Sequence, residues 1–195
     1  MNGEGAVALA GGSLRGGVAA RKAADDYQRA FIEAYERQYT KIFAYVYSRV
    51  GNVELAKDLT AEVFEKAYVK GHGVREAAAY TTWLFMIAKN VVIGHYRRQK
   101  RENNGLTKMK DSLWLSDRPA EPEAGALHGE AVSNLMRHVR GLSGRDQELL
   151  ALKFEGELSY VEISRVLGLS EVNARVSIFR ALKRLRGLME AEGGC

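Results

Sequence analysis

Apolar side chains recur every three or four residues over most of this chain, which is the pattern of amphipathic helices. In the first half, the periodicity predicts a long helix that begins at Tyr27 and ends at Gly51. A second helix is expected after Asn52, a residue type that caps helix N-termini, and it ends at Gly71-His72-Gly73. A third is expected over about 76–101. No alternation of the kind that strands show competes with these helices.

The second half begins a new helical pattern near Glu130. Ser143 is placed to cap a helix over Arg145–Phe154 that Gly156 ends. Two further helices follow at close spacing, and their start and stop signals are strong. Ser159-Tyr160-Val161-Glu162 is a capping box, Gly168 ends the helix that it opens, and Ser170 caps the last helix, which spans Val172–Met189.

Two segments lack this periodicity. Residues 1–26 are rich in Gly and Ala and are expected to be a disordered tail. Residues 102–129 contain both prolines of the chain and are expected to be a flexible linker. The chain is therefore predicted to be all-α, with two small helical domains at 27–101 and 130–192 on either side of that linker.

Composition narrows the classes of function. One cysteine, Cys195, cannot form an internal disulfide or a thiolate metal site, so we expect a reducing compartment, the cytoplasm, and neither metal nor cofactor. No apolar run approaches the roughly 20 residues that cross a bilayer, so no membrane insertion is expected. The net charge of +5 is mild, and the clustering of basic residues is more informative than their number.

The first basic cluster lies on the last helix, which carries no acidic residue between Val172 and Met189. Together with the preceding capped helix it forms a predicted helix-turn-helix, whose second helix enters a DNA major groove. Seven residues on its outward face are candidates for DNA contact: Asn173, Arg175, Val176, Phe179, Arg180, Lys183 and Arg184. The alternative is an ordinary amphipathic helix with a solvated basic face.

The second basic cluster ends the third helix, where aromatic residues accompany it. Basic side chains follow a phosphate backbone and aromatic rings stack on unpaired bases, so this helix is a candidate for single-stranded DNA. The candidates are Trp83, Lys89, Asn90, Tyr96, Arg97, Arg98 and Arg101. For Trp83, a role as a core anchor is an equal alternative.

A third feature is an acidic stripe on the second helix. Its members, Glu54, Asp58, Glu62 and Glu65, are three or four residues apart and so share one face. Such a stripe is usually only solvated, but it could also meet a basic protein surface.

These motifs together resemble bacterial RNA polymerase sigma factors of the extracytoplasmic-function (ECF) class. The segment 52–68 is similar to the family's "AxDLxxEVFxKAY" pattern, and 83–90 matches "WLxxIAxN". His95-Tyr96-Arg97-Arg98 follows as the family's basic tail does, while 142–147 and 158–163 resemble the start of its second domain. The resemblance covers about 27–101 and 130–189.

The resemblance implies a factor that gives core RNA polymerase its promoter specificity and catalyses nothing. The acidic stripe would bind the β′ clamp helices, and the stretch from Gly71 to Asn90 would bind and open the −10 element. The loop Gly71–Arg75 would hold a flipped base. The last domain would read the −35 element and touch the β flap, and the linker would thread towards the polymerase active-site channel. Members of the class are commonly inhibited by an anti-sigma factor, so we expect one here.

Two positions depart from the family pattern. Gly94 stands where an Asp is frequent, and Gly costs about 1 kcal/mol relative to Ala inside a helix, so a local bend is expected there. Ser177 stands where many members carry a further Arg, which alters the expected promoter sequence.

Three other classes of protein fit these motifs less well. A stand-alone helix-turn-helix regulator would need neither the acidic stripe nor the basic-aromatic helix. A non-DNA adaptor would not need an acid-free recognition helix. An enzyme would show a nucleophile–base pair, a metal cluster or a phosphate loop, and no such motif is found in the sequence.

Overall fold

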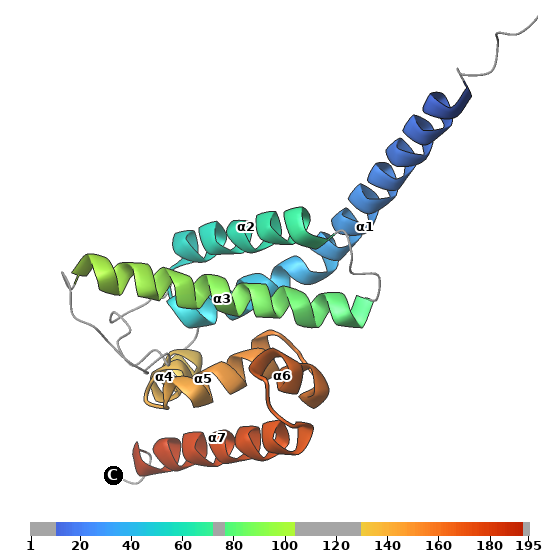
Figure 1. The fold of residues 1–195 in the computed structure, drawn as a ribbon. Coiled ribbons are helices and arrows are strands. Elements are labelled where there is room, and N and C mark those ends of the chain that lie inside the picture. Colours follow the sequence, from blue (N-terminus) through green and yellow to red (C-terminus); the bar gives the residue numbers. More distant parts are fainter. Residues whose placement is uncertain (1–10, 72–76, 104–129, 193–195) are drawn as a thin grey trace, which may run out of the picture. The chain divides into compact units, whose positions relative to one another are not determined.

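The computed structural model describes residues 11–71, 77–103 and 130–192. Every regular element within these ranges is a helix (Figure 1), which confirms the all-α prediction. By its contacts the chain divides into a short N-terminal unit, residues 1–37, and a large unit, residues 38–195, which holds all the helices after the first.

The first helix, α1, spans Gly11–Val50. The predicted start at Tyr27 is therefore wrong, because the helix already runs through most of the expected tail. Alanines and long charged side chains between 19 and 26 favour a helix intrinsically even though they have no apolar stripe to bury. The side chains of 21–26 are exposed, which is why no periodicity marked them.

Helices α2 (Val53–Lys70) and α3 (Ala77–Asn103) pack against each other and complete the first helical group. The Asn52 side chain caps α2 as predicted, accepting a hydrogen bond of 2.9 Å from the Leu55 amide. Helix α3 continues through Gly94, so the expected bend does not interrupt it. The largest fully buried side chains of this group come from α1, α2 and α3: Ile42, Tyr45, Val46, Val63, Leu84, Phe85 and Val92.

The second helical group contains α4 (Glu130–Arg140), α5 (Gly144–Leu150), η2 (Ala151–Glu155), α6 (Tyr160–Leu167) and α7 (Glu171–Glu192). The single helix expected over 145–154 is thus an α-helix followed by a π-helical turn. Leu142, Leu150 and Ala181 are buried together, with Leu185 packed against them.

Gly156 follows η2 and is needed for space. A Cβ atom there would lie 2.8 Å from the Leu152 carbonyl oxygen and 2.8 Å from Cε1 of Phe85 on α3. Real Cβ contacts are essentially never that short, so only glycine allows this approach. The predicted role of Gly156 as a helix terminator is extended by a packing role that the sequence did not indicate.

Helices α6 and α7 form the predicted helix-turn-helix. Both halves of the Ser159–Glu162 capping box are present. Gly168 has a φ of 66°, a left-handed conformation that side chains disfavour, and the amide of Leu169 donates to the Ser164 carbonyl over 2.8 Å. Ser170 accepts a hydrogen bond from the Asn173 amide at the start of α7. The turn therefore holds α7 at an angle set by local hydrogen bonds.

Several sequence predictions lie outside the described residues. They are most of the Gly71–Arg75 loop, nearly all of the 102–129 linker and the first ten residues of the tail. Among the helices that the structure describes, none is long and apolar enough to cross a membrane.

Candidate nucleic-acid interface

Helix α7 turns one face to the protein and the opposite face to solvent. Ala174, Ile178 and Ala181 are buried at a spacing of three and four residues. The candidate residues Asn173, Arg175, Val176, Phe179 and Arg180 are all exposed, and Phe179 is 68% exposed. Val172, Val176 and Phe179 are exposed together on α7, and a grouped apolar patch among arginines has the composition of a contact surface.

Tyr160, the first residue of α6, organises one of these arginines. The Arg175 guanidinium lies 5.1 Å from the centre of the Tyr160 ring, and Lys153 Nζ lies 4.8 Å from it. Arg175 also forms an ion pair of 3.2 Å with Glu171 on its own helix. Cation–π contacts and a helical ion pair limit the rotamers of Arg175, and so they pre-orient its side chain.

Arg184 has a different environment from the other candidates on α7. Its Nη2 and Nε atoms donate to the two oxygens of Asp146 over 2.6 and 2.9 Å. The Asp146 side chain is 7% exposed and that of Arg184 is 53% exposed. Hydrogen bonding to Asp146 raises the pKa of Arg184 above its ordinary value. The guanidinium therefore ties α7 to α5, whereas the neighbouring Lys183 is exposed.

On α3 the candidates divide into half-buried and exposed side chains. Trp83 is half-buried with its ring 5.6 Å from that of Tyr80, an arrangement that fits neither a free stacking platform nor a full core anchor. Asn90, Arg97, Arg98 and Arg101 are exposed. They are the α3 candidates that solvent, or a ligand, reaches most directly.

Three of the α3 candidates make contacts with other helices of the protein. Lys89 Nζ donates to the Val166 carbonyl of α6 over 3.2 Å, and the Tyr96 hydroxyl donates to the Arg49 carbonyl over 2.8 Å. Arg98 lies 3.6 Å from a Glu62 oxygen. Next to Tyr96, burial, assisted by repulsion from Arg98, lowers the pKa of His95.

The acidic stripe of α2 is mostly exposed, with Glu54, Asp58 and Glu65 open to solvent. Glu54 pairs with Lys57 over 2.8 Å. Glu62 is half-buried and is bound by Lys66 of its own helix and by Arg98 of α3. The structure thus brings together two candidates, Glu62 and Arg98, that the sequence assigned to different surfaces.

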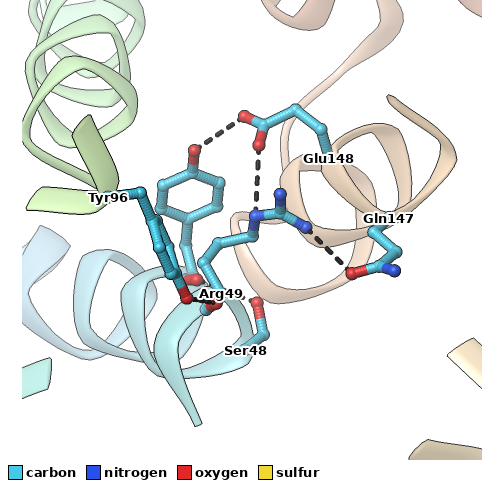
Figure 2. Close-up of polar contacts among 6 residues, drawn as sticks. Ser48, Arg49, Tyr96, Gln147 and Glu148 are labelled. Atoms are coloured by element: carbon cyan, nitrogen blue, oxygen red, sulfur yellow. Dashed lines mark hydrogen bonds and ion pairs between the residues drawn. The ribbon is translucent and has the colours of Figure 1, made fainter. Parts of the chain in front are cut away.

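A buried polar cluster was missed entirely by sequence reasoning (Figure 2). The Tyr45 hydroxyl donates to Glu148 over 2.7 Å, and Arg49 Nε lies 3.2 Å from the other Glu148 oxygen. Arg49 also donates to Gln147 Oε1 over 3.4 Å. Burial, and then the Glu148 charge, raises the pKa of Tyr45 well above its ordinary value. In the sequence, Arg49 looks like an ordinary basic residue in the last turn of a helix. Gln147 and Glu148 look like solvent-exposed residues near the start of a helix. Nothing in the neighbouring sequence therefore indicated that they are buried together.

Comparison with protein families gives two matches in this chain. Residues 31–102 match sigma-70 region 2, and residues 133–185 match sigma-70 region 4. The first match covers α2 and nearly all of α3, and the second covers α6 and most of α7.

The individual relatives that this chain is similar to are also sigma factors. The chain is 30% identical over 161 residues to the ECF RNA polymerase sigma factor BldN of Streptomyces coelicolor, covering 82% of this chain and 60% of BldN. It is 29% identical to the ECF sigma factor SigM of Bacillus subtilis, covering 80% of this chain and 93% of SigM. It is 30% identical to the ECF sigma factor SigF of Caulobacter vibrioides, with 74% of each chain covered. The chain thus spans less than two thirds of BldN but most of SigM.

Among solved structures, the sigma factor RpoE of Bartonella quintana, crystallised with the anti-sigma factor NepR, has a similar fold. Its TM-score to this chain is 0.57 at 21% identity, and the match covers 85% of this chain and 97% of that one.

Proposed function

The chain belongs to the extracytoplasmic-function class of RNA polymerase sigma factors, non-enzymatic subunits that direct RNA polymerase to promoters, and we propose that three of its helices divide this work. In this proposal α7 reads the −35 element, α3 binds and helps to melt the −10 element, and α2 binds the β′ clamp helices of the polymerase. A stand-alone helix-turn-helix regulator has no use for a region 2 match beside the region 4 match, so that alternative is set aside.

The observation that carries the proposal is the outward face of α7. A capped helix-turn-helix presents Asn173, Arg175, Val176, Phe179 and Arg180 to solvent over one continuous face. An arginine pairs bidentately with guanine, and an apolar side chain touches the methyl group of thymine. Arg175, pre-oriented on Tyr160, is best placed for a base, and Lys183 for a phosphate. Because Asp146 holds Arg184, we propose that Arg184 mainly positions α7.

For the −10 element we propose the exposed residues Asn90, Arg97 and Arg101 as the first contacts, with Trp83 at the edge of the same helix. Lys89, Tyr96 and Arg98 make internal contacts in this structure, so they would join the DNA only after exchanging those partners. Stacking on an aromatic ring is worth about 1–3 kcal/mol per unpaired base, enough to favour an opened strand.

For the polymerase we propose the exposed carboxylates Glu54, Asp58 and Glu65 as the contact, with Glu62 mainly holding Arg98 of α3. Like charges three and four residues apart repel one another slightly, and a basic partner surface removes that repulsion. The β flap is the proposed contact of the second helical group.

The relevant compartment and inhibitor follow from the same proposal. A factor that binds RNA polymerase acts in the cytoplasm. The RpoE structure holds an anti-sigma factor, and we propose that a protein of that kind also binds this chain.

The experiment is run-off transcription from a genomic promoter library with core RNA polymerase, with and without this protein. New start sites that require the protein are expected, and their alignment gives both promoter elements. An Arg180→Ala variant should lose a subset of these promoters, whereas Arg145→Ala, an equal loss of charge at an exposed site on α5, should retain them. The absence of any protein-dependent start site would refute the proposal.

A further inference from the structure

Glu171 is an acidic residue on a helix face that is otherwise basic. It is the first residue of α7, and no other acidic residue follows on this helix before Glu190. Its side chain is 49% exposed, so it shares solvent with the candidate DNA contacts of the same helix. A carboxylate near DNA repels the phosphates and weakens binding to any sequence. A contact between Glu171 and a hydrogen-bond donor on the DNA would offset that cost.

Glu171 is joined to Arg175, the arginine that lies against Tyr160. Glu171 Oε1 accepts from Arg175 Nη2 over 3.2 Å, and the guanidinium lies 5.1 Å from the centre of the Tyr160 ring. The ion pair uses one oxygen of the carboxylate and one nitrogen of the guanidinium. A carboxylate has further acceptor sites and a guanidinium has further N–H donors. The pair therefore keeps acceptors on Glu171 and donors on Arg175 for a ligand.

The position of the pair along α7 matters more than its strength. Both side chains are substantially exposed, and exposed ion pairs within a helix contribute little to stability. The same helix has a second pair of this kind near its other end, Arg186 with Glu190, over 2.7 Å. In a helix-turn-helix, the N-terminal residues of the recognition helix contact the base edges. Glu171 and Arg175 are at that end of α7, whereas Arg186 and Glu190 are not.

The spacing of Glu171 and Arg175 fits two neighbouring base pairs. Residues four apart lie on one face of a helix, about 6 Å apart along its axis. Stacked base pairs are separated by about 3.4 Å, and the two side chains converge from that 6 Å spacing to their 3.2 Å contact. In the major groove, arginine pairs with O6 and N7 of guanine, and a carboxylate accepts from the N4 amino group of cytosine.

We propose that Glu171 determines promoter specificity by accepting a hydrogen bond from a cytosine next to the guanine that Arg175 reads. The inference rests on the proposed function, in which α7 reads the −35 element. Cytosine offers only a donor at its major-groove edge, which suits a carboxylate. Guanine and thymine offer acceptors there, and adenine has the acceptor N7 beside its amino group, so these three bases fit Glu171 less well.

The test uses holoenzyme assembled from core RNA polymerase and the full chain. Bound promoters are selected from a library in which the −35 element is randomised, and are then sequenced. Wild type should select a guanine that Arg175→Ala no longer selects and, beside it, a cytosine. Glu171→Gln should exchange this cytosine for adenine, because the amide of Gln pairs with N6 and N7 of adenine. Glu171→Ala should show no preference at that base pair and should bind the wild-type promoter roughly fivefold more weakly, the low end for one base contact.

Glu190→Gln is the matched control. It makes the same change of charge and breaks the same kind of ion pair on the same helix, and it should keep the wild-type preference at both base pairs. Because the Glu171 side chain is exposed, its variants should keep the circular dichroism spectrum and melting temperature of the wild type. A change in base preference then reports a contact with DNA and not a loss of folding.

Several outcomes would overturn the inference while the proposed function stands. One is a wild-type selection without cytosine beside the guanine, and another is a cytosine preference that both Glu171 variants retain. A third is a weaker guanine preference with no change at the neighbouring base pair, since Glu171 would then only position Arg175. An equal loss of affinity on all sequences would limit Glu171 to stabilising the helix. A wild-type holoenzyme that selects no −35 sequence would refute the proposed function, and the inference with it.

Discussion

Arg184 lies on the proposed DNA-binding helix, but its contact with Asp146 indicates that it stabilises the fold. Replacing Arg184 by Ala tests this assignment quantitatively. The guanidinium is held by both oxygens of Asp146, at 2.6 and 2.9 Å. Asp146 is also part of the start of α5, where its carboxylate accepts a hydrogen bond of 2.8 Å from Ser143. Arg184→Ala would leave a buried carboxylate with that single side-chain donor.

The magnitude follows from burial. Removing one partner of a fully buried ion pair costs about 3–5 kcal/mol. The Arg184 side chain is 53% exposed, so water screens the pair and the loss is smaller. Hydrogen bonds to charged groups contribute about 1.5–3 kcal/mol. We expect Arg184→Ala to lower the free energy of unfolding by about 2 kcal/mol, and Asp146→Asn, which retains an acceptor, to cost less.

The assay is urea unfolding followed by far-ultraviolet circular dichroism. Lys183→Ala is the matched control, an exposed neighbour on the same helix whose loss should change stability by no more than about 0.5 kcal/mol. In promoter binding, Lys183→Ala should have the larger effect of the two variants. Loss of one phosphate contact should reduce the slope of affinity against salt concentration by about one ion. If Arg184→Ala unfolds like wild type but reduces the salt dependence, the structural assignment is wrong.

Three other substitutions test separate surfaces. Asp58→Lys should weaken binding to core polymerase in a pull-down titration without altering the melting temperature, because Asp58 is exposed; unchanged binding would exclude this face. Arg175→Ala should cost roughly 1–3 kcal/mol of promoter affinity and relax specificity at one base pair, and an equal loss on all sequences in a binding-site selection would indicate a phosphate contact instead. Gly156→Ala should destabilise the chain by about 1–3 kcal/mol, measured by thermal unfolding, because its Cβ would overlap Phe85 and Leu152; wild-type stability would show that these neighbours move aside easily.

The helix starts and stops were predictable because they depend on neighbouring residues. Asn52, Ser143 and Ser159 cap helices by accepting backbone hydrogen bonds within three residues, and Gly168 adopts a left-handed conformation at the end of α6. The exception is the start of α1. The residues there favour a helix but bury no apolar face, so the sequence shows no periodic pattern that would predict it.

The sequence predicted which residues belong to the candidate site. It did not predict which of their side chains are engaged by other residues of the protein. Spacing alone placed Arg175, Phe179 and Arg180 on one face, and they are exposed. It could not tell that Arg98 lies against Glu62, because the partners are on different helices and far apart in the chain.

The sequence by itself determined the helices, their caps and the helix-turn-helix, along with the family to which the chain belongs. These features are local, since each depends on side chains within a turn or two of one another. Only the tertiary structure decided which charges are buried, as with Arg49 and Glu148, and which cation stabilises the fold, as with Arg184. The reason is physical: the free energy of a charge depends on its burial and on its partner, and both are set by residues distant in sequence.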